Sequence, residues 1–349
     1  MKFQNLFLIF TLILINSCAL SVNKNFGKYQ TQFISKSAFA PTKEELYSKK
    51  PKIIVFALDE NGNSVAEQSG LGKTIANNVE NILTENSLAQ LVDRNANNKL
   101  KNEIALAELN KSTSYKGPQV ADYAISGAIS NANFNSKYIN GSTYVNPKNF
   151  QIVSIPPRYQ YIAEVSGNLK VYELPSLKVV ENIEFSGKEK RTENVRNKGG
   201  VSLGGIQIGG EQMSGTQRDD GLVRKASQDA IDDISIKMKN IFSKTGYILE
   251  KRSLGKKTIF KVSIGRIDGA KKGDNFEIIS KQEIENPITN EIEIERRIIA
   301  KGQVSDKIDP DSSWVVIEDN DAIERIKIGD KVKLVYKQSF FSKIMKLIK

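Results

Sequence analysis

Residues 155–171 alternate apolar or small side chains with mostly polar ones over about 17 positions, which predicts one long β-strand. Leu174-Pro175-Ser176 then turns the chain, and residues 178–185 alternate again as its antiparallel partner. The protein is therefore expected to contain a long hairpin. One face of the predicted strand comprises Ile155, Pro157, Tyr159, Tyr161, Ala163, Val165, Gly167, Leu169 and Val171.

The sequence around this hairpin predicts a mixed α/β domain over residues 51–252. An apolar run at 53–58 indicates a buried strand, and Leu71, Ile75 and Val79 recur at helical spacing. Further strands are expected at 88–94, 121–129 and 247–251, and further helices at 100–109 and 222–242. Two stretches of extra sequence, 131–154 and 190–220, are inserts in this pattern.

A second domain is predicted over residues 256–337. Short apolar alternations separated by Asp268-Gly269, Asn286-Pro287 and Asp309-Pro310 indicate a small all-β barrel or sandwich. Lys272-Gly273-Asp274 and Ile328-Gly329-Asp330 each precede a strand, which suggests an internal pseudo-repeat. We expect these turns to serve packing or interaction rather than chemistry.

The first 17 residues have the features of a secretory signal peptide. Lys2 precedes an apolar run from Leu6 that is too short to span a bilayer as a mature helix. The run ends in Ile15-Asn16-Ser17-Cys18, which resembles the bacterial lipobox, and the only cysteine of the protein stands at its lipid-accepting position. We therefore expect residues 1–17 to be removed and Cys18 to carry lipid.

The residues after Cys18 indicate a compartment. In lipoproteins of this type an Asp after the cysteine retains the protein in the inner membrane, whereas Ala19 follows here and implies an outer-membrane protein facing the periplasm. The formal net charge of +11 would otherwise suggest nucleic acid, but the basic residues are scattered among acids, so we expect none as a partner. Residues 18–50 are polar without a sustained period and are expected to be a lipid tether.

The composition argues against an enzyme. The chain contains 0 His and 1 Cys, which excludes His-based acid-base catalysis, His-ligated metals, Cys-His nucleophiles and internal disulfides. The acid pairs Asp219-Asp220 and Asp232-Asp233 are adjacent in sequence, and the second pair points to different sides of its helix. No catalytic residue, cofactor or metal is expected.

One segment imitates a phosphate-binding loop. Ser69-Gly70-Leu71-Gly72-Lys73-Thr74 follows a strand and opens a helix, as such a loop requires. The pattern also needs Gly five places before Gly72, where this chain has Glu67, an anion at the phosphate position. The segment is better explained as a helix start whose glycines allow close packing.

Residues 15–252 resemble the CsgG/HfaB-type curli assembly and transport lipoproteins. The similarity lies in the lipobox, PKIIVFALDENG, SGLGKTIANNVENIL, LAQLVDR, ADYAISGAISN, NLKVYELPSLKVVENIEFSG and the helix ending in GYILEKR. The resemblance implies a periplasmic fold like an anticodon-binding domain. It also implies a ring in the outer membrane, in which each subunit lends two β-hairpins to a shared barrel that passes unfolded polypeptide.

The two inserts lie where the resemblance places the hairpins. Residues 155–165 suit a lipid-facing strand, with Tyr159 and Tyr161 on the apolar face. The Asn-rich segment 131–149 and the segment 192–220 suit one poorly, so the inserts form either membrane strands or polar periplasmic loops. The loop 61–70 lacks the aromatic residues of the curli pores, and no constriction residue is carried over.

The second domain and the tail allow further comparison. The segments GRIDGAKKGDNFEII, GQVSDKI and IKIGDKVKLVY resemble the SH3-like C-terminal domain of FlgT-type flagellar proteins. Residues 338–349 form a basic amphipathic pattern with Phe341, Ile344, Met345 and Ile348 on one helical face. Such a tail either lies on a membrane surface or docks on the barrel or a neighbouring subunit.

Three functions remain open. The first is a CsgG-type ring, homo-oligomeric and lipid-anchored, that serves secretion or assembly of a secreted or envelope protein. The second is a periplasmic scaffold ring of a flagellar basal body, which the second domain favours. The third is an LpoB-like regulator of a peptidoglycan synthase, because such activators share the expected core fold.

Overall fold

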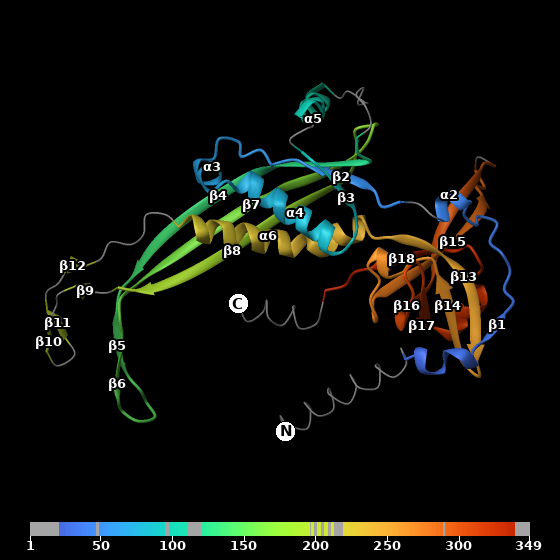
Figure 1. Ribbon diagram of the computed structural model, residues 1–349. Coiled ribbons are helices and arrows are strands. Elements are labelled where there is room, and N and C mark those ends of the chain that lie inside the picture. Colours follow the sequence, from blue (N-terminus) through green and yellow to red (C-terminus); the bar gives the residue numbers. More distant parts are fainter. Residues whose placement is uncertain are drawn as a thin grey trace. The chain divides into compact units, whose positions relative to one another are not determined.

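The computed structural model describes residues 21–46, 49–94, 98–110, 120–195, 197–198, 201–203, 206–208, 211–212, 219–288 and 290–338. The chain divides into two compact units, each visible in Figure 1. The first, here called the α/β unit, consists of Lys52–Ile82 and Leu91–Ser235. The second, the barrel unit, consists of the described residues up to Pro51 together with Leu83–Gln90 and Ile236 onward.

A five-stranded sheet in the order β3-β2-β4-β7-β8 forms the centre of the α/β unit. β2 pairs with β4 in parallel, and β4, β7 and β8 are antiparallel neighbours, so the sheet is mixed as the predicted α/β class requires. The long hairpin of the sequence pattern is confirmed as β7 and β8. The predicted start of its first strand is wrong: β7 begins at Arg158, because Pro156 and Pro157 have no N–H for a strand ladder, and Ile155 belongs to a separate short strand. The strands are β2 (Lys52–Val55), β3 (Gln90–Val92), β4 (Tyr123–Ile139), β7 (Arg158–Glu173) and β8 (Lys178–Asn194).

Four helices belong largely to this unit: α3 (Ser64–Ser69), α4 (Leu71–Glu85), α5 (Asn98–Asn110) and α6 (Asp220–Ile241). Leu71, Ile75 and Val79 of α4 are fully buried, so the helical period read from the sequence is confirmed. α6 lies directly on β8 at Gly187, where an added Cβ would stand 2.1 Å from the carbonyl oxygen of Ala226. The core of this unit thus sits between the sheet and its helices.

The inserts are β-structure in their described parts. β4 and β8 run well beyond the predicted strand ends, so residues 131–139 and 190–194 continue the sheet instead of leaving it. Short antiparallel pairs follow them: β5 (Ser142–Val145) with β6 (Ile152–Ile155), β9 (Asn197–Lys198) with β12 (Glu211–Gln212), and β10 (Val201–Leu203) with β11 (Ile206–Ile208). No helix in the described residues is long and apolar enough to cross a membrane.

The second unit is a six-stranded antiparallel barrel, which refines the predicted barrel or sandwich. Its strands follow the order β13-β14-β17-β16-β15-β18, and β13 pairs with β18 to close it. The interior holds Phe260, Phe276, Ile278, Val315 and Val332. The strands are β13 (Thr245–Leu254), β14 (Lys257–Val262), β15 (Asn275–Glu285), β16 (Ile292–Ile308), β17 (Ser313–Ile317) and β18 (Lys331–Val335).

The structure moves two boundaries. The strand expected at 247–251 to close the first domain is β13, which pairs with β14 and β18 of the barrel, because its buried Ile248 belongs to the barrel core. The expected tether 18–50 is structured from Ser21. Residues 21–46, here called the N-terminal strap, contain the 3-10 helix η1 (Asn23–Lys28), β1 (Gln30–Gln32) and α2 (Lys43–Leu46).

Candidate functional site

The far part of the α/β sheet is a three-stranded ribbon, here called the distal ribbon. It consists of residues 131–139 of β4, 158–166 of β7 and 186–194 of β8, all in continuous antiparallel register. β4, β7 and β8 are 17, 16 and 17 residues long, about three times the usual length. Figure 1 shows these strands extending past the start of α6.

Both outer strands of the distal ribbon have an open edge in the described part of the chain. β8 ends the sheet, and β2 pairs with β4 only at Tyr123, Ala124 and Ile125. Farther along β4, the side-chain amides of Asn61 and Asn63 donate to the carbonyl oxygens of Ile129 and Ala132, both at 3.1 Å. Asp59 also forms a backbone bridge to Ala128 at this edge. Beyond Ala132, no strand in the described residues pairs with this edge of β4, and open edges are templates for pairing with another chain.

Four aromatic side chains form a row on one face of the distal ribbon. Phe134 and Tyr161 stack with ring centroids 5.9 Å apart, and Tyr138 meets Tyr159 edge-on at 5.2 Å. Arg191 lies 5.2 Å from the Tyr161 ring centroid and forms a 2.5 Å ion pair with Asp219, the residue before α6. The row therefore ties β4, β7 and β8 to the start of the helix.

The aromatic row changes the expectation that Tyr159 and Tyr161 face lipid. Tyr159 and Tyr161 were expected together on a lipid-facing strand, but Tyr161 is only 2% exposed in the single chain. The stack and the guanidinium of Arg191 explain its burial. Of the two tyrosines, only Tyr159 keeps partial exposure.

The apolar residues of the first insert gather at the β5–β6 hairpin. Tyr144, Val145 and Ile152 are at least half exposed, and Phe150 in the connecting turn is 81% exposed. Large apolar side chains concentrated at one exposed tip are typical of a protein or membrane contact. The prediction from the Asn-rich segment 131–149 missed this, because Tyr144 and Val145 are isolated among polar residues there and Phe150 and Ile152 lie beyond it.

The opposite face of the distal ribbon is polar. Lys188 on β8 forms an ion pair with Glu164 on β7, and this hydrogen bond, with the charge of Lys188, lowers the pKa of the Glu164 carboxyl. Nearby, the side chains of Asn168 and Asn182 make a 3.3 Å hydrogen bond. The face thus carries an ion pair within the distal ribbon and a hydrogen bond between amides just outside it.

The phosphate-loop imitation is a packed helix start. Gly70 caps α3 with φ +61°, and the N–H of Gly72 in α4 donates to the Glu60 carboxylate at 2.8 Å. A Cβ on Gly72 would lie 2.3 Å from the Leu58 carbonyl oxygen, which confirms the close-packing explanation. A carboxylate therefore holds a backbone N–H that a phosphate would need.

The acid pairs have structural partners. Asp219 pairs with Arg191, and Asp220 accepts from the Ser69 hydroxyl at 3.2 Å. In α6, Asp232 accepts from the Gln228 amide at 2.8 Å. Among the described residues, no group of three or more acidic, Cys or His side chains could hold a metal ion.

The two Gly-Asp turns of the barrel have the same geometry, as the pseudo-repeat predicts. Gly273 and Gly329 have φ values of +87° and +86°. The carboxylates of Asp274 and Asp330 each accept from the N–H three residues earlier at 2.8 Å. Burial raises the pKa of both aspartates against these hydrogen bonds. The two turns stand directly before β15 and β18 and fix the backbone at the start of each strand.

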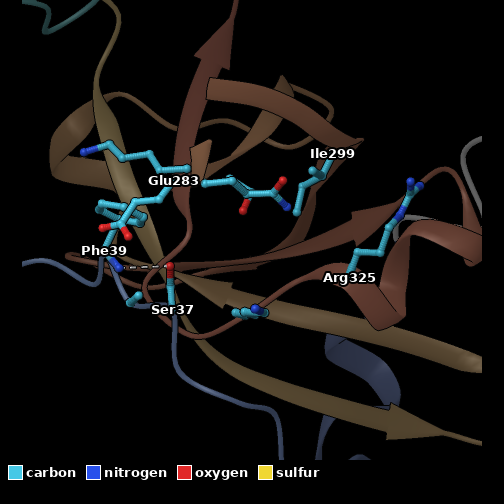
Figure 2. Close-up of a pocket in the computed structure, with 10 residues that line it drawn as sticks. Ser37, Phe39, Glu283, Ile299 and Arg325 are labelled. Atoms are coloured by element: carbon cyan, nitrogen blue, oxygen red, sulfur yellow. Dashed lines mark hydrogen bonds between the residues drawn. The ribbon is translucent and has the colours of Figure 1, made fainter. Parts of the chain in front are cut away.

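A shallow pocket lies between the N-terminal strap and β15 (Figure 2). The Phe39 ring centroid lies 5.9 Å from the Lys281 ammonium nitrogen, and Arg325 lies on the opposite side of the pocket from Phe39. The strap is held here by the Ser37 N–H, which donates to the Ile328 carbonyl at 2.8 Å. Cations dominate the charged lining, but the pocket is open and contains no arrangement of catalytic groups in the described residues.

Cys18, the one predicted modification site, lies outside the described residues, as do the leader 1–17 and residues 339–349 of the tail. No known protein family matches the chain, and no curated protein matches it. Among solved structures, a PelC dodecamer from Paraburkholderia phytofirmans aligns at 12% identity, covering 59% of this chain and 97% of that one with a TM-score of 0.24. A TM-score this low does not establish a shared fold.

Proposed function

We propose that the protein is an outer-membrane lipoprotein that assembles with copies of itself into a ring and takes part, without catalysis, in secretion or assembly of an extracellular or envelope protein. The distal ribbon is the observation that carries the proposal. Its three long strands end in hairpins and leave an edge of β4 and an edge of β8 open. Edge-to-edge contact between successive copies would cover both, and such a head-to-tail contact generates a ring when the rotation closes.

Two sequence features support the envelope location. The lipobox ending at Cys18 provides a lipid anchor, and Ala19 directs the mature chain to the outer membrane in proteins of this type. The resemblance of residues 15–252 to CsgG-type lipoproteins points to the same compartment and to membrane hairpins in the inserts. The exposed apolar tip of β5–β6 is consistent with that role.

The decisive experiment measures assembly and membrane protection together. The mass of the detergent-extracted protein by light scattering should be a multiple of the chain mass. In intact outer membranes, trypsin should fail to cut at Lys137 and Arg191, which lie on outer strands of the distal ribbon. A monomer in detergent that shows no conductance in planar bilayers would contradict both the pore and the ring.

The barrel unit favours a second candidate, a scaffold ring in the periplasm. The β15–β16 hairpin projects three exposed isoleucines, Ile292, Ile294 and Ile298, from one strand, as a docking surface would. A multimer whose Lys137 and Arg191 are readily cut would select this scaffold. A monomer that captures a peptidoglycan synthase would instead select the regulator.

A further inference from the structure

The N-terminal strap is fastened to the barrel immediately after the expected anchor. The Asp306 carboxylate on β16 accepts from the backbone N–H groups of Val22 and Asn23 at 2.7 and 2.9 Å and from the Ser21 hydroxyl at 3.2 Å. Val22 itself is 1% exposed. The first described residues of the chain are therefore held against the barrel wall.

An aromatic contact fixes the next turn of the strap. The Phe26 ring meets the Trp314 indole edge-on with centroids 5.0 Å apart. The Arg252 guanidinium lies 5.0 Å from the Phe26 ring and 4.9 Å from the Trp314 ring, and Lys307 approaches Phe26 at 5.5 Å. Cations over aromatic faces add to the apolar burial of these rings.

The outer wall of the barrel is shaped to receive this turn. Ile259 and Trp314 point away from the barrel interior and are buried beneath the strap together with Val22 and Tyr29. Removing the strap would expose Trp314 and Ile259 of the barrel wall to water, together with Val22 and Tyr29 of the strap itself. The contact is thus a small hydrophobic core in its own right.

The short chain between Cys18 and the bound strap limits the distance between a lipid on Cys18 and the barrel wall. Val22 lies four positions after Cys18, and four residue steps span at most about 14 Å when fully extended. A free tether over residues 18–50 would have a root-mean-square reach of roughly 30 Å. The fastened strap therefore allows far less separation between a lipid at Cys18 and the barrel wall.

We propose that the strap, clamped by Asp306 and Trp314, holds this wall of the barrel at the lipid headgroup layer, so that the barrel has a membrane-facing surface. This rests on the lipidation of Cys18 in the proposed function. The exposed lysines near the clamp, Lys24 and Lys28 on η1 and Lys272 beside Asp306, suit anionic headgroups. The occupant of the surface is the bilayer that carries the anchor.

The single tryptophan of the protein, Trp314, makes a direct test possible. Full-length acylated protein is reconstituted in phosphatidylethanolamine and phosphatidylglycerol vesicles, with or without a nitroxide label on the headgroups. Nitroxide quenches only nearby fluorophores, so wild-type Trp314 fluorescence should fall in labelled vesicles. Mass spectrometry of the N-terminal peptide establishes acylation in the same sample.

Two changes should weaken the quenching by different routes. A twelve-residue Gly/Ser insertion between Leu20 and Ser21 leaves the clamp intact but raises the root-mean-square reach to roughly 20–24 Å, so the quenched fraction should fall about two-fold or more. The double variant Phe26→Ala, Asp306→Ala should release the strap and reduce the quenching of Trp314 to the same extent. Its Trp314 emission should also shift to the red, and trypsin should cleave faster after Lys24 and Lys28. Asp311→Asn, an exposed carboxylate in a neighbouring loop, is the matched control and should behave as wild type.

The outcomes separate the two proposals. An acylated protein whose Trp314 is not quenched, or is quenched equally with the insertion, overturns the membrane-facing surface and leaves the lipid anchor standing. A mature chain without acyl groups overturns the anchor and the surface together.

Discussion

The two sheets of the protein differ in their edges: the barrel sheet is closed and the α/β sheet is open. The barrel pairs β13 with β18 and closes on itself, and β1 covers part of β13 that lies beyond this closure. The α/β sheet ends in β8, and the distal ribbon has an open edge on each side in the described residues. A closed barrel needs no partner for its backbone, whereas the open ribbon has backbone groups available for one. In the proposed function, the barrel therefore needs no partner and the distal ribbon is the part through which copies would pair.

The largest expected effect is a loss of stability on replacing a closely packed glycine in one of the two sheets, and it tests whether the two units unfold separately. Gly187→Val would force a side chain into α6, because even an added Cβ would lie only 2.5 Å from the backbone nitrogen of Ala230. Overpacking of this kind costs about 1–3 kcal/mol or more. Helix content by circular dichroism should melt earlier while the Trp314 signal of the barrel changes little.

Gly302→Val is the reciprocal control in the barrel. Its Cβ would lie 2.1 Å from the Val316 carbonyl oxygen and close to the Phe276 ring. Trp314 should then report the earlier transition, since it stands on the strand that Gly302 faces. Identical shifts of both signals in both variants would contradict the division into two units.

The second prediction concerns acid and the strap on the barrel. Burial acts to raise the pKa of Asp306, but hydrogen bonds from Asn23, Val22 and Ser21 outweigh it and hold the pKa below its usual range. The stabilisation is therefore fully present above the unfolded pKa near 4 and is lost as the pH falls through the folded value. Trp314 emission should shift to the red in that range while the barrel remains folded.

The corresponding loss in strap docking is about 1–2 kcal/mol, because hydrogen bonds to a charged but partly exposed group are involved. Asp306→Asn should remove the acid-dependent step, because an amide does not titrate there. An unchanged step in this variant would show that another group controls release.

A smaller effect is expected in the distal ribbon. Arg191→Ala removes the ion pair to Asp219 and the contact over Tyr161, and leaves the Asp219 carboxylate without that partner. Because the Arg191 side chain is 42% exposed, we expect about 1–2 kcal/mol of destabilisation by urea denaturation. Arg191→Lys should restore only part of it, since the planar guanidinium matches both partners. A full recovery would show that only the charge matters.

The periodic segments were predictable and the long-range docking was not. Alternation located β7, and helical spacing located α4, since both patterns reflect one buried face. The strap escaped prediction because the helical spacing of Val22, Phe26 and Tyr29 is confined to one short polar segment, and these side chains pack only against distant strands of the barrel. One signal was present: Ser313–Ile317 is continuously apolar after its first residue, as a strand covered on both faces must be.

The candidate site was predictable only in outline. The positions of the two hairpins follow from the inserts, but the extension of β4 through an Asn-rich segment does not, because that segment lacks the apolar alternation of a core strand. The β4 backbone is instead contacted from outside the segment, where the side-chain amides of Asn61 and Asn63 donate to the carbonyl oxygens of Ile129 and Ala132. The burial of Tyr161 likewise depends on Arg191, 30 residues away along the chain.

The smallest expected effect lies on the polar face of the distal ribbon. Glu164→Gln breaks the ion pair with Lys188. The Glu164 side chain is 37% exposed and the Lys188 side chain is 49% exposed, so water and salt screen most of the attraction between them. We expect a change in unfolding free energy below about 1 kcal/mol, with a difference from wild type that shrinks as salt is raised. The pKa of Glu164 is lowered, so this contribution should fade as the pH falls toward 4 and below.

If assembly buries this face, the same substitution should cost clearly more in the oligomer than in the monomer, because a desolvated ion pair loses that screening. Equal costs in both states would place the contact between copies on the strand edges rather than on this face.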